Sequence, residues 1–102
     1  MNRALTHSID EGIAAITCLR EPRAMAFIEG VARLLAACFQ RGNKVLIAGN
    51  GGSLCDASHF AEELSGLFRK QRRALPAIAL SDPGHITCTA NDLGFEFVFS
   101  RA

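Results

Sequence analysis

The chain has 102 residues, about half of them apolar, and its 11 basic and 10 acidic residues leave a formal net charge of +1. This length suits one small domain, and the near-neutral charge predicts neither wholesale nucleic-acid binding nor an acidic disordered tail. No stretch approaches the roughly 18 apolar residues that a membrane span needs, and residues 1–20 carry acids and no clear cleavage site. We therefore expect a cytoplasmic protein that binds neither membranes nor nucleic acid, with a helix and not a signal peptide at its start.

The cysteines agree with that compartment. Cys18, Cys38, Cys55 and Cys88 show no CxxC spacing and lie in apolar segments. The pattern predicts buried thiols in a reducing cytoplasm.

Two amphipathic helices are predicted before residue 43. Ser8 and Glu11 have capping-box spacing at the start of the first helix or just inside it. Pro22 suits the first position of the second helix, and Gly42 with Asn43 suits its end. Both apolar stripes are broad enough to need partners. They consist of Ile9, Ile13 and Ile16 in the first helix, and Phe27, Ile28, Val31, Leu34, Leu35 and Cys38 in the second.

The character of the sequence then changes. The segments KVLIA (residues 44–48) and PAIAL (76–80) are short, apolar and β-prone, which predicts strands near Val45–Ala48 and Ala77–Leu80 that are buried on both faces. A helix between two such strands predicts a right-handed βαβ unit with a parallel sheet.

The connecting helix follows the turn GNGGS (residues 49–53). Ser53 is its predicted cap, with Asp56 at the third position. Its predicted core stripe consists of Leu54, Ala57, Ala61, Leu64 and Phe68.

After the second strand, SDPGHITCTAND predicts a turn and a short helix through Ile86 to Ala90, and LGFEFVFSRA predicts a further helix or turn. Two strands do not make a stable parallel sheet, because such sheets bury both faces and need neighbours at their edges. We therefore expect the front part of a larger α/β domain, either truncated or completed by partner chains.

The glycine turn has two interpretations. Glycines after a parallel strand let backbone N–H groups approach a ligand, and the helix N-terminus that follows favours negative charge. GNGGS is neither GxGxxG nor a P-loop with its lysine. A tight strand-to-helix turn and a cradle for a phosphate or sugar hydroxyl therefore both remain open.

His59 and Glu63 form the sharper feature. Their i, i+4 spacing places both on one helix face, with Cβ atoms about 5–6 Å apart and directed away from the apolar stripe. They are either a solvated pair joined by a hydrogen bond, or a metal half-site or acid–base pair. Glu62 is turned about 100° away, and neither His7 nor His85 has a spacing that completes a site.

Two more polar segments are ambiguous. Asn91 and Asp92 either end a helix or contact a ligand. The basic residues Arg69, Lys70, Arg72 and Arg73 are typical of a solvated connection, although such a run can also attract a phosphate or nucleic acid.

The combination of GNGGSLCDASHFAEELSG, PAIALSD and AND-GFE--FSR resembles the N-terminal half of the phosphoheptose isomerases, a family of the sugar-isomerase (SIS) superfamily. The resemblance runs from about residue 44 to the end. It implies a three-layer αβα sandwich with a Rossmann-like parallel sheet, preceded by N-terminal helices. Residues 1–43 would be the helical segment and residues 44–102 the first half of the SIS domain. The family usually assembles as a homotetramer with active sites between subunits.

The implied reaction interconverts sedoheptulose 7-phosphate and D-glycero-D-manno-heptose 7-phosphate, in the carbohydrate metabolism that supplies lipopolysaccharide heptose. The resemblance makes His59 a zinc ligand, and Glu63 a zinc ligand, a substrate contact and the catalytic base. One zinc ion per site would take its remaining ligands from outside this chain. The other implied substrate contacts are Asn50, Gly51, Gly52, Ser53, Asn91 and Asp92.

Departures from the family pattern bear on activity. Leu67 stands where members often carry an arginine. The Ser/Thr-rich phosphate loop, and the glutamine and histidine that complete the family's metal and acid groups, do not occur in the 102 residues, so we expect the chain alone to be inactive. The alternative is a non-catalytic SIS protein that binds a replication-initiator partner. Such proteins share the turn and HFA but lack the second glutamate of AEE, so Glu63 favours the isomerase.

Overall fold

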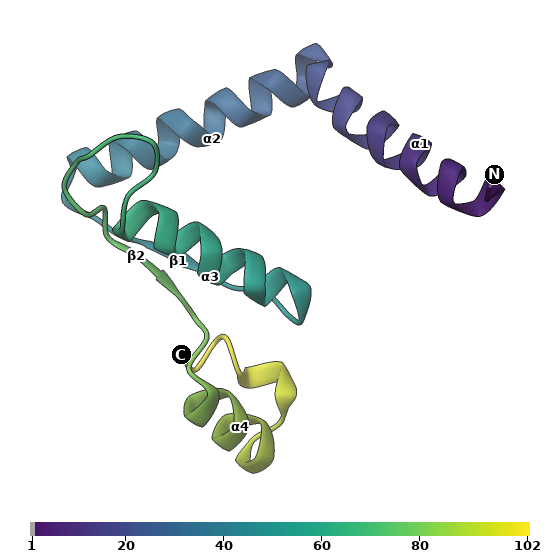
Figure 1. Cartoon of the computed structure of the whole chain (residues 1–102). Helices are drawn as coiled ribbons and strands as arrows, with labels where there is room; N and C mark the ends of the chain where they lie inside the picture. Colours follow the sequence, from purple (N-terminus) through teal and green to yellow (C-terminus); the bar gives the residue numbers. More distant parts are fainter. Residues whose placement is uncertain (1) are drawn as a thin grey trace. The chain divides into compact units, whose positions relative to one another are not determined.

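The computed structural model describes residues 2–102, which divide into two compact units, residues 2–37 and Cys38–Ala102. Figure 1 labels the helices and strands along the chain. The first unit holds α1 (Arg3–Thr17), a 3₁₀ turn (Cys18–Arg20) and most of α2 (Pro22–Gln40). Within the described residues, no helix is long and apolar enough to cross a membrane.

The ends of these two helices follow from local chemistry. The Asn2 side chain accepts hydrogen bonds from the backbone N–H groups of Ala4 and Leu5, so Ser8 lies inside α1 and does not cap it. The helix α2 begins at Pro22, as predicted. It stops where Gly42 adopts a φ of 74°, a left-handed conformation that glycine tolerates, so the predicted stop is confirmed.

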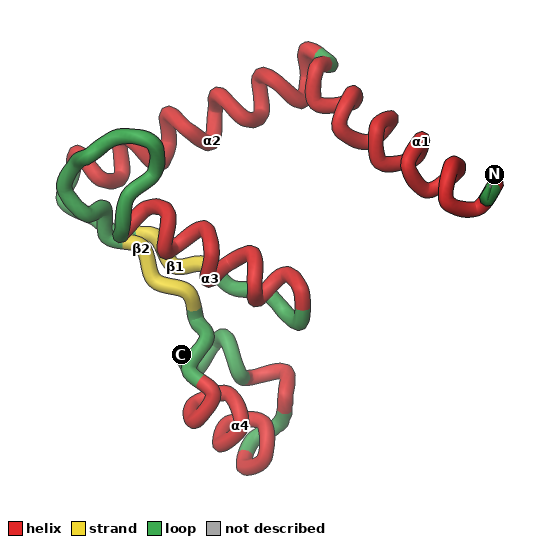
Figure 2. Tube along the Cα trace, in the orientation of Figure 1, coloured by secondary structure: helices red, strands yellow, loops and turns green. Residues whose placement is uncertain are grey.

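The second unit contains the predicted βαβ arrangement. The strands β1 (Val45–Ile47) and β2 (Ala77–Ala79) pair in parallel, with Leu46 opposite Ile78. Between them in sequence, α3 (Gly52–Ser65) lies along the strands (Figures 1 and 2). The positions of α3 that pack against the sheet are small alanines, which allows the helix and the strands to approach closely. They are Ala57 and Ala61, which are 4% and 7% exposed.

The opposite face of the sheet is open. Leu46 and Ile78, whose side chains alternate away from α3, are 57% and 51% exposed. The prediction that both strands are buried on both faces is therefore wrong for residues 2–102, because α3 covers one face and no described element covers the other.

Both observed ends of α3 differ from the predicted ones. The cap is Gly51 and not Ser53, because Gly51 turns the chain with a φ of 52° and starts the helix at Gly52. Ser53 therefore lies in the first turn, where its backbone N–H donates to the Asn50 carbonyl at 2.9 Å. At the other end the helix stops at Ser65, so Phe68 is not part of the core stripe and is 52% exposed.

The chain continues into α4 (Pro83–Asp92) and a 3₁₀ turn (Phe95–Phe97), which confirms the predicted short helix and following turn. The Asp82 carboxylate caps α4 by accepting the His85 backbone N–H at 2.7 Å. Val98, after the 3₁₀ turn, is 2% exposed.

The cysteine prediction fails on burial. Cys18, Cys55 and Cys88 are exposed and Cys38 is half-buried, and all four are free thiols. Apolar neighbours in sequence did not imply burial, because Cys55 and Cys88 lie on helix faces that remain exposed among residues 2–102.

Candidate functional site

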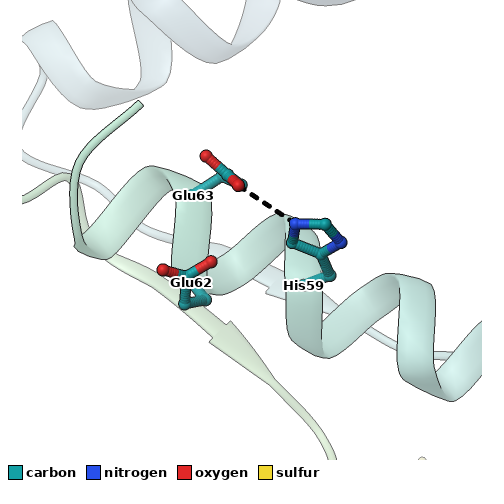
Figure 3. A group of neighbouring side chains, drawn as sticks. All are labelled: His59, Glu62 and Glu63. Carbon is teal, nitrogen blue, oxygen red and sulfur yellow. Dashed lines mark hydrogen bonds and ion pairs between the residues drawn. The ribbon is translucent and has the colours of Figure 1, made fainter. Parts of the chain in front are cut away.

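The outer face of α3 gathers three side chains that can bind a metal or move a proton. Figure 3 shows His59 and Glu63 directed toward each other, with Glu62 beside them. The distance from His59 Nε2 to Glu63 Oε1 is 3.0 Å, so the predicted i, i+4 pair is in contact. The side chain of Glu63 is 31% exposed and that of His59 is 72% exposed. The carboxylate is therefore the more enclosed partner.

Glu62 was missed by the sequence analysis. One candidate ligand atom from each of His59, Glu62 and Glu63 lies within 4.8 Å of the other two. The i, i+3 spacing of Glu62 from His59 was the available signal, since residues three apart are neighbours on a helix surface. Glu62 was set aside because of its orientation relative to its neighbour Glu63, so its proximity to His59 was overlooked.

A shallow pocket of about 310 Å³ surrounds the pair and is lined by Asp56, His59, Phe60, Glu63 and Phe68. Two phenylalanines thus flank a histidine and two carboxylates. The Arg69 guanidinium stacks over the Phe68 ring, with Cζ 5.1 Å from the ring centroid. Mixed apolar and polar walls of this kind suit a small polar ligand that also has a carbon skeleton.

The end of α3 beneath the pocket is held by Arg72. Its Nη2 donates to the Glu63 backbone carbonyl at 2.7 Å, and its Nη1 donates to the Leu64 and Gly66 carbonyls at 2.9 and 3.2 Å. These are carbonyls at a helix C-terminus, where a cation is favoured. The interpretation of the basic run as a solvated connection is therefore wrong for Arg72, which is half-buried.

The glycine turn lies at the other end of α3. A Cβ on Gly49 would collide with the backbone carbonyl of Ser53, and the positive φ of Gly51 also favours glycine. The turn follows the carboxyl end of β1, the edge where open parallel sheets bind ligands. Ten residues separate Ser53 from Glu63, about 15 Å along a helix. In one copy of the chain, the turn and the His59–Glu63 pair are therefore separate.

Asn91 and Asp92 form a third location, in the last turn of α4. Asn91 Nδ2 donates to Asp92 Oδ1 at 3.0 Å, and Cys88 Sγ donates to Asp92 Oδ2 at 3.3 Å. These hydrogen bonds, from Asn91 first and then Cys88, lower the pKa of Asp92. The same contact, together with the negative charge of Asp92, raises the pKa of the Cys88 thiol. All three side chains are exposed.

The chemistry of the α3 cluster fits a divalent metal such as zinc. Imidazole nitrogen and carboxylate oxygen bind zinc at about 2.0–2.2 Å, so two ligands of one ion lie about 3–4 Å apart. The 3.0 Å separation of His59 Nε2 and Glu63 Oε1 is close to that spacing. The fit identifies His59, Glu62 and Glu63 as the candidate ligands.

Comparisons with known proteins assign the family. A model described as the SIS domain matches residues 10–101, most of the chain. The chain belongs to the SIS domain family. Solved structures agree: this SIS chain matches the phosphoheptose isomerase from Francisella tularensis with a TM-score of 0.76 and 37% sequence identity, over 98% of this chain and 50% of that one. The corresponding values for the phosphoheptose isomerase from Neisseria gonorrhoeae are 0.70 and 37%, over 96% and 48%.

Curated proteins similar to the SIS chain are also named phosphoheptose isomerase. It is 67% identical over 73 residues to the phosphoheptose isomerase of Fusobacterium nucleatum, covering 72% of this chain and 38% of that protein. It is 53% identical over 83 residues to that of Vibrio cholerae, covering 81% and 44%. The resemblance noted in the sequence is thus confirmed, and the chain spans less than half the length of these two relatives.

Proposed function

We propose that this chain forms part of a phosphoheptose isomerase, an enzyme that interconverts sedoheptulose 7-phosphate and D-glycero-D-manno-heptose 7-phosphate. The observation that carries the proposal is the contact between His59 and Glu63 at 3.0 Å, in a pocket on a helix of an SIS domain. The identity of 67% to a phosphoheptose isomerase supports the substrate class. A cytoplasmic role in carbohydrate metabolism that supplies lipopolysaccharide heptose follows from that substrate.

Glu63 is the proposed catalytic base. Ketose–aldose isomerisation moves a proton between neighbouring carbons through an enediol, which needs a base close to the sugar carbon. A carboxylate suits this task, and Glu63 is on a regular helix and only 31% exposed. His59 Nε2 contacts only Oε1 of this carboxylate, so its other oxygen is available for the substrate proton.

His59 and Glu63 are the residues proposed to hold zinc, with further ligands from outside residues 1–102. When bound, the ion supplies Lewis-acid polarisation of the sugar carbonyl and hydroxyl oxygens. Glu62, within 4.8 Å of both, adds negative charge that favours a cation at this end of α3.

The remaining proposed substrate contacts are Asn50, Gly51, Gly52 and Ser53 in the glycine turn, and Asn91 and Asp92 in α4. Along the helix, the turn lies about 15 Å from Glu63, which is too far for one small sugar to contact both. A homo-oligomer, a tetramer in this family, resolves the separation if the turn of one copy faces Glu63 of another.

The proposed architecture is a three-layer αβα sandwich. Residues 1–43 form its N-terminal helical segment and residues 44–102 the first half of the SIS domain. The open face of the sheet at Leu46 and Ile78 supports this proposal, because a second helical layer would cover these two exposed side chains.

Replacement of Glu63 tests the function. Glu63→Gln keeps the shape of the side chain and removes the base, so we expect kcat to fall at least about a hundredfold in the protein at its full natural length. Isomerisation is followed with sedoheptulose 7-phosphate, with metal content measured in parallel. The matched control is Glu29→Gln, an exposed glutamate that pairs with Arg33 on α2. Near wild-type turnover by Glu63→Gln with full metal content would remove Glu63 from the mechanism.

Ligand binding separates the enzyme from a non-catalytic SIS protein. Substrate that binds the folded state raises the melting temperature as its concentration exceeds Kd. Sedoheptulose 7-phosphate should therefore stabilise the full-length protein progressively. Absence of any shift at millimolar sugar phosphate, together with absence of turnover, would contradict the proposed function.

A further inference from the structure

We propose that Arg72 is a positioning residue for Glu63. The guanidinium fork fixes the last turn of α3, and with it the direction of the Glu63 carboxylate and the Phe68 wall of the pocket. The catalytic meaning of this clamp rests on the proposed function. The clamp itself is a set of contacts within the second unit of this chain.

The last turn of α3 needs an external partner. Glu63 is two residues from the helix end at Ser65, and the terminal carbonyls of a helix have no N–H donors of their own. Gly66 bonds back to the Glu62 carbonyl at 2.7 Å and then leaves the helix with φ −92° and ψ −127°. Without other donors this turn would fray, and the candidate base would move with it.

Arg72 supplies those donors in a geometry that lysine cannot copy. Its Nη2 reaches the Glu63 carbonyl at 2.7 Å, while its Nη1 reaches the carbonyls of Leu64 at 2.9 Å and Gly66 at 3.2 Å. The planar guanidinium presents several donors in one fixed fork, whereas the ammonium of lysine is a single point charge. The positive charge also lies at the negative end of the helix dipole.

The same contacts fasten the following loop. The backbone N–H of Leu75 donates to the Leu64 carbonyl at 3.0 Å, so Arg72 and Leu75 both anchor the loop to the helix end. Between the helix and these anchors, Arg69 adopts a φ of 58°, which is uncommon for a residue with a side chain. Phe68 precedes Arg69 and lines the pocket beside Glu63. A strained turn is kept in place only when its surroundings hold it, and Arg72 binds the carbonyls of Leu64 and Gly66 just before this turn.

Arg72 acts on the backbone of Glu63 and not on its carboxylate, whose Oε1 contacts His59. Loss of the clamp should therefore leave the base chemically intact but poorly placed. Misplacement of a reacting group by about 1 Å can cost on the order of a hundredfold in rate. We expect this loss in kcat, with a smaller change in KM.

The test compares Arg72→Ala and Arg72→Lys with Arg73→Ala, in the protein at its full natural length. Arg73 is adjacent and exposed, and among residues 2–102 only its backbone carbonyl accepts a hydrogen bond, from Arg72 Nη1 at 3.2 Å. Replacement of its side chain leaves that carbonyl in place, so Arg73→Ala is the matched control. Hydrogen exchange of the amides at residues 62–66 should be about tenfold faster or more in Arg72→Ala, as expected for loss of one charged hydrogen bond. The amides of α4 should be unaffected in all three variants.

Catalysis provides the second measurement. We expect kcat to fall about tenfold to a hundredfold in Arg72→Ala, less in Arg72→Lys, and not in Arg73→Ala. Guanidinium ion added at low millimolar concentration should restore part of the lost kcat in Arg72→Ala, because it can occupy the vacated donor position. A loss of kcat through general destabilisation would instead be accompanied by faster exchange of the α4 amides as well. If Arg72→Ala does not fold, Arg72→Lys carries both measurements.

The outcomes separate this inference from the proposed function. Unchanged exchange at residues 62–66 in the Arg72 variants would overturn the clamp, even with Glu63→Gln inactive. Faster exchange with unchanged kcat would also overturn the positioning role. If Arg72→Ala showed faster exchange while Glu63→Gln proved fully active, the clamp would stand and only the proposed function would be rejected.

Discussion

At the scale of single residues, side chains in the same chain differ in chemistry because of one or two neighbours. Cys88 illustrates this, because its thiol donates a hydrogen bond to the Asp92 carboxylate at 3.3 Å. Cys55, on α3, is likewise an exposed free thiol and serves for comparison. The contact raises the pKa of Cys88 by its hydrogen bond first and by the charge of Asp92 second. At a given pH the thiol of Cys88 is therefore less ionised, and less reactive, than without Asp92.

Asp92→Asn should reverse that effect. The amide carries no charge, so the pKa of Cys88 falls and more thiolate is present at a mildly alkaline pH. We expect faster alkylation of Cys88 by iodoacetamide, followed by mass spectrometry of the modified peptide. Cys55 in the same sample is the internal control and should react at an unchanged rate. Equal rates for Cys88 in the two proteins would show that Asp92 does not govern this thiol.

The pKa of the Asp92 carboxyl is shifted in the opposite direction from that of Cys88. Its pKa is lowered by hydrogen bonds from Asn91 and Cys88, so its stabilising effect is present above the ordinary carboxyl pKa and is lost as pH falls through the lowered value. The group is exposed, so screening by solvent keeps the effect small.

At the scale of the elements, glycine lowers stability at one position and is needed for the backbone conformation at another. Gly12 lies inside α1, where an added Cβ would meet open space, whereas Gly51 caps α3 with φ 52° and ψ −122°. Glycine inside a helix is unfavourable relative to alanine, but only glycine adopts the backbone of Gly51 at low cost.

Two substitutions should therefore act in opposite directions. Gly12→Ala should stabilise the protein by about 0.5–1 kcal/mol, and Gly51→Ala should destabilise it by about 1–3 kcal/mol. Urea unfolding followed by circular dichroism measures both, and each variant serves as the other's control. A neutral or stabilising Gly51→Ala would mean that the turn relaxes easily and does not fix the start of α3.

The sequence was informative where period and spacing decide structure. Both strands were predicted within one residue of their observed ends, and the 3.0 Å contact of His59 and Glu63 follows from helical spacing. It was uninformative where the deciding contact crosses a loop. Arg72 reaches carbonyls six to nine residues earlier, and no pattern in the run RKQRR distinguishes it from Arg73. The cap at Gly51 was missed because a serine nearby had the stronger local signal.

At the scale of the whole molecule, the open sheet face is the most informative feature. A two-stranded parallel sheet with one exposed face is not stable by itself, because parallel sheets bury both faces. Leu46 and Ile78 lie on that face, in strands whose other side chains pack toward α3. The three-layer architecture proposed above requires that further structure cover these two residues.

Leu46→Lys distinguishes a covered face from an open one. In the protein at its full natural length, a buried lysine without a partner should cost about 3 kcal/mol or more, seen as a large drop in melting temperature. In residues 1–102 alone, the same change should leave stability nearly unchanged and reduce self-association measured by light scattering, because it breaks an exposed apolar patch. Gln71→Lys, the same gain of charge on an exposed loop, should do neither. If Leu46→Lys were harmless at full length, the sheet would be open there too, and the proposed second helical layer would have to be abandoned.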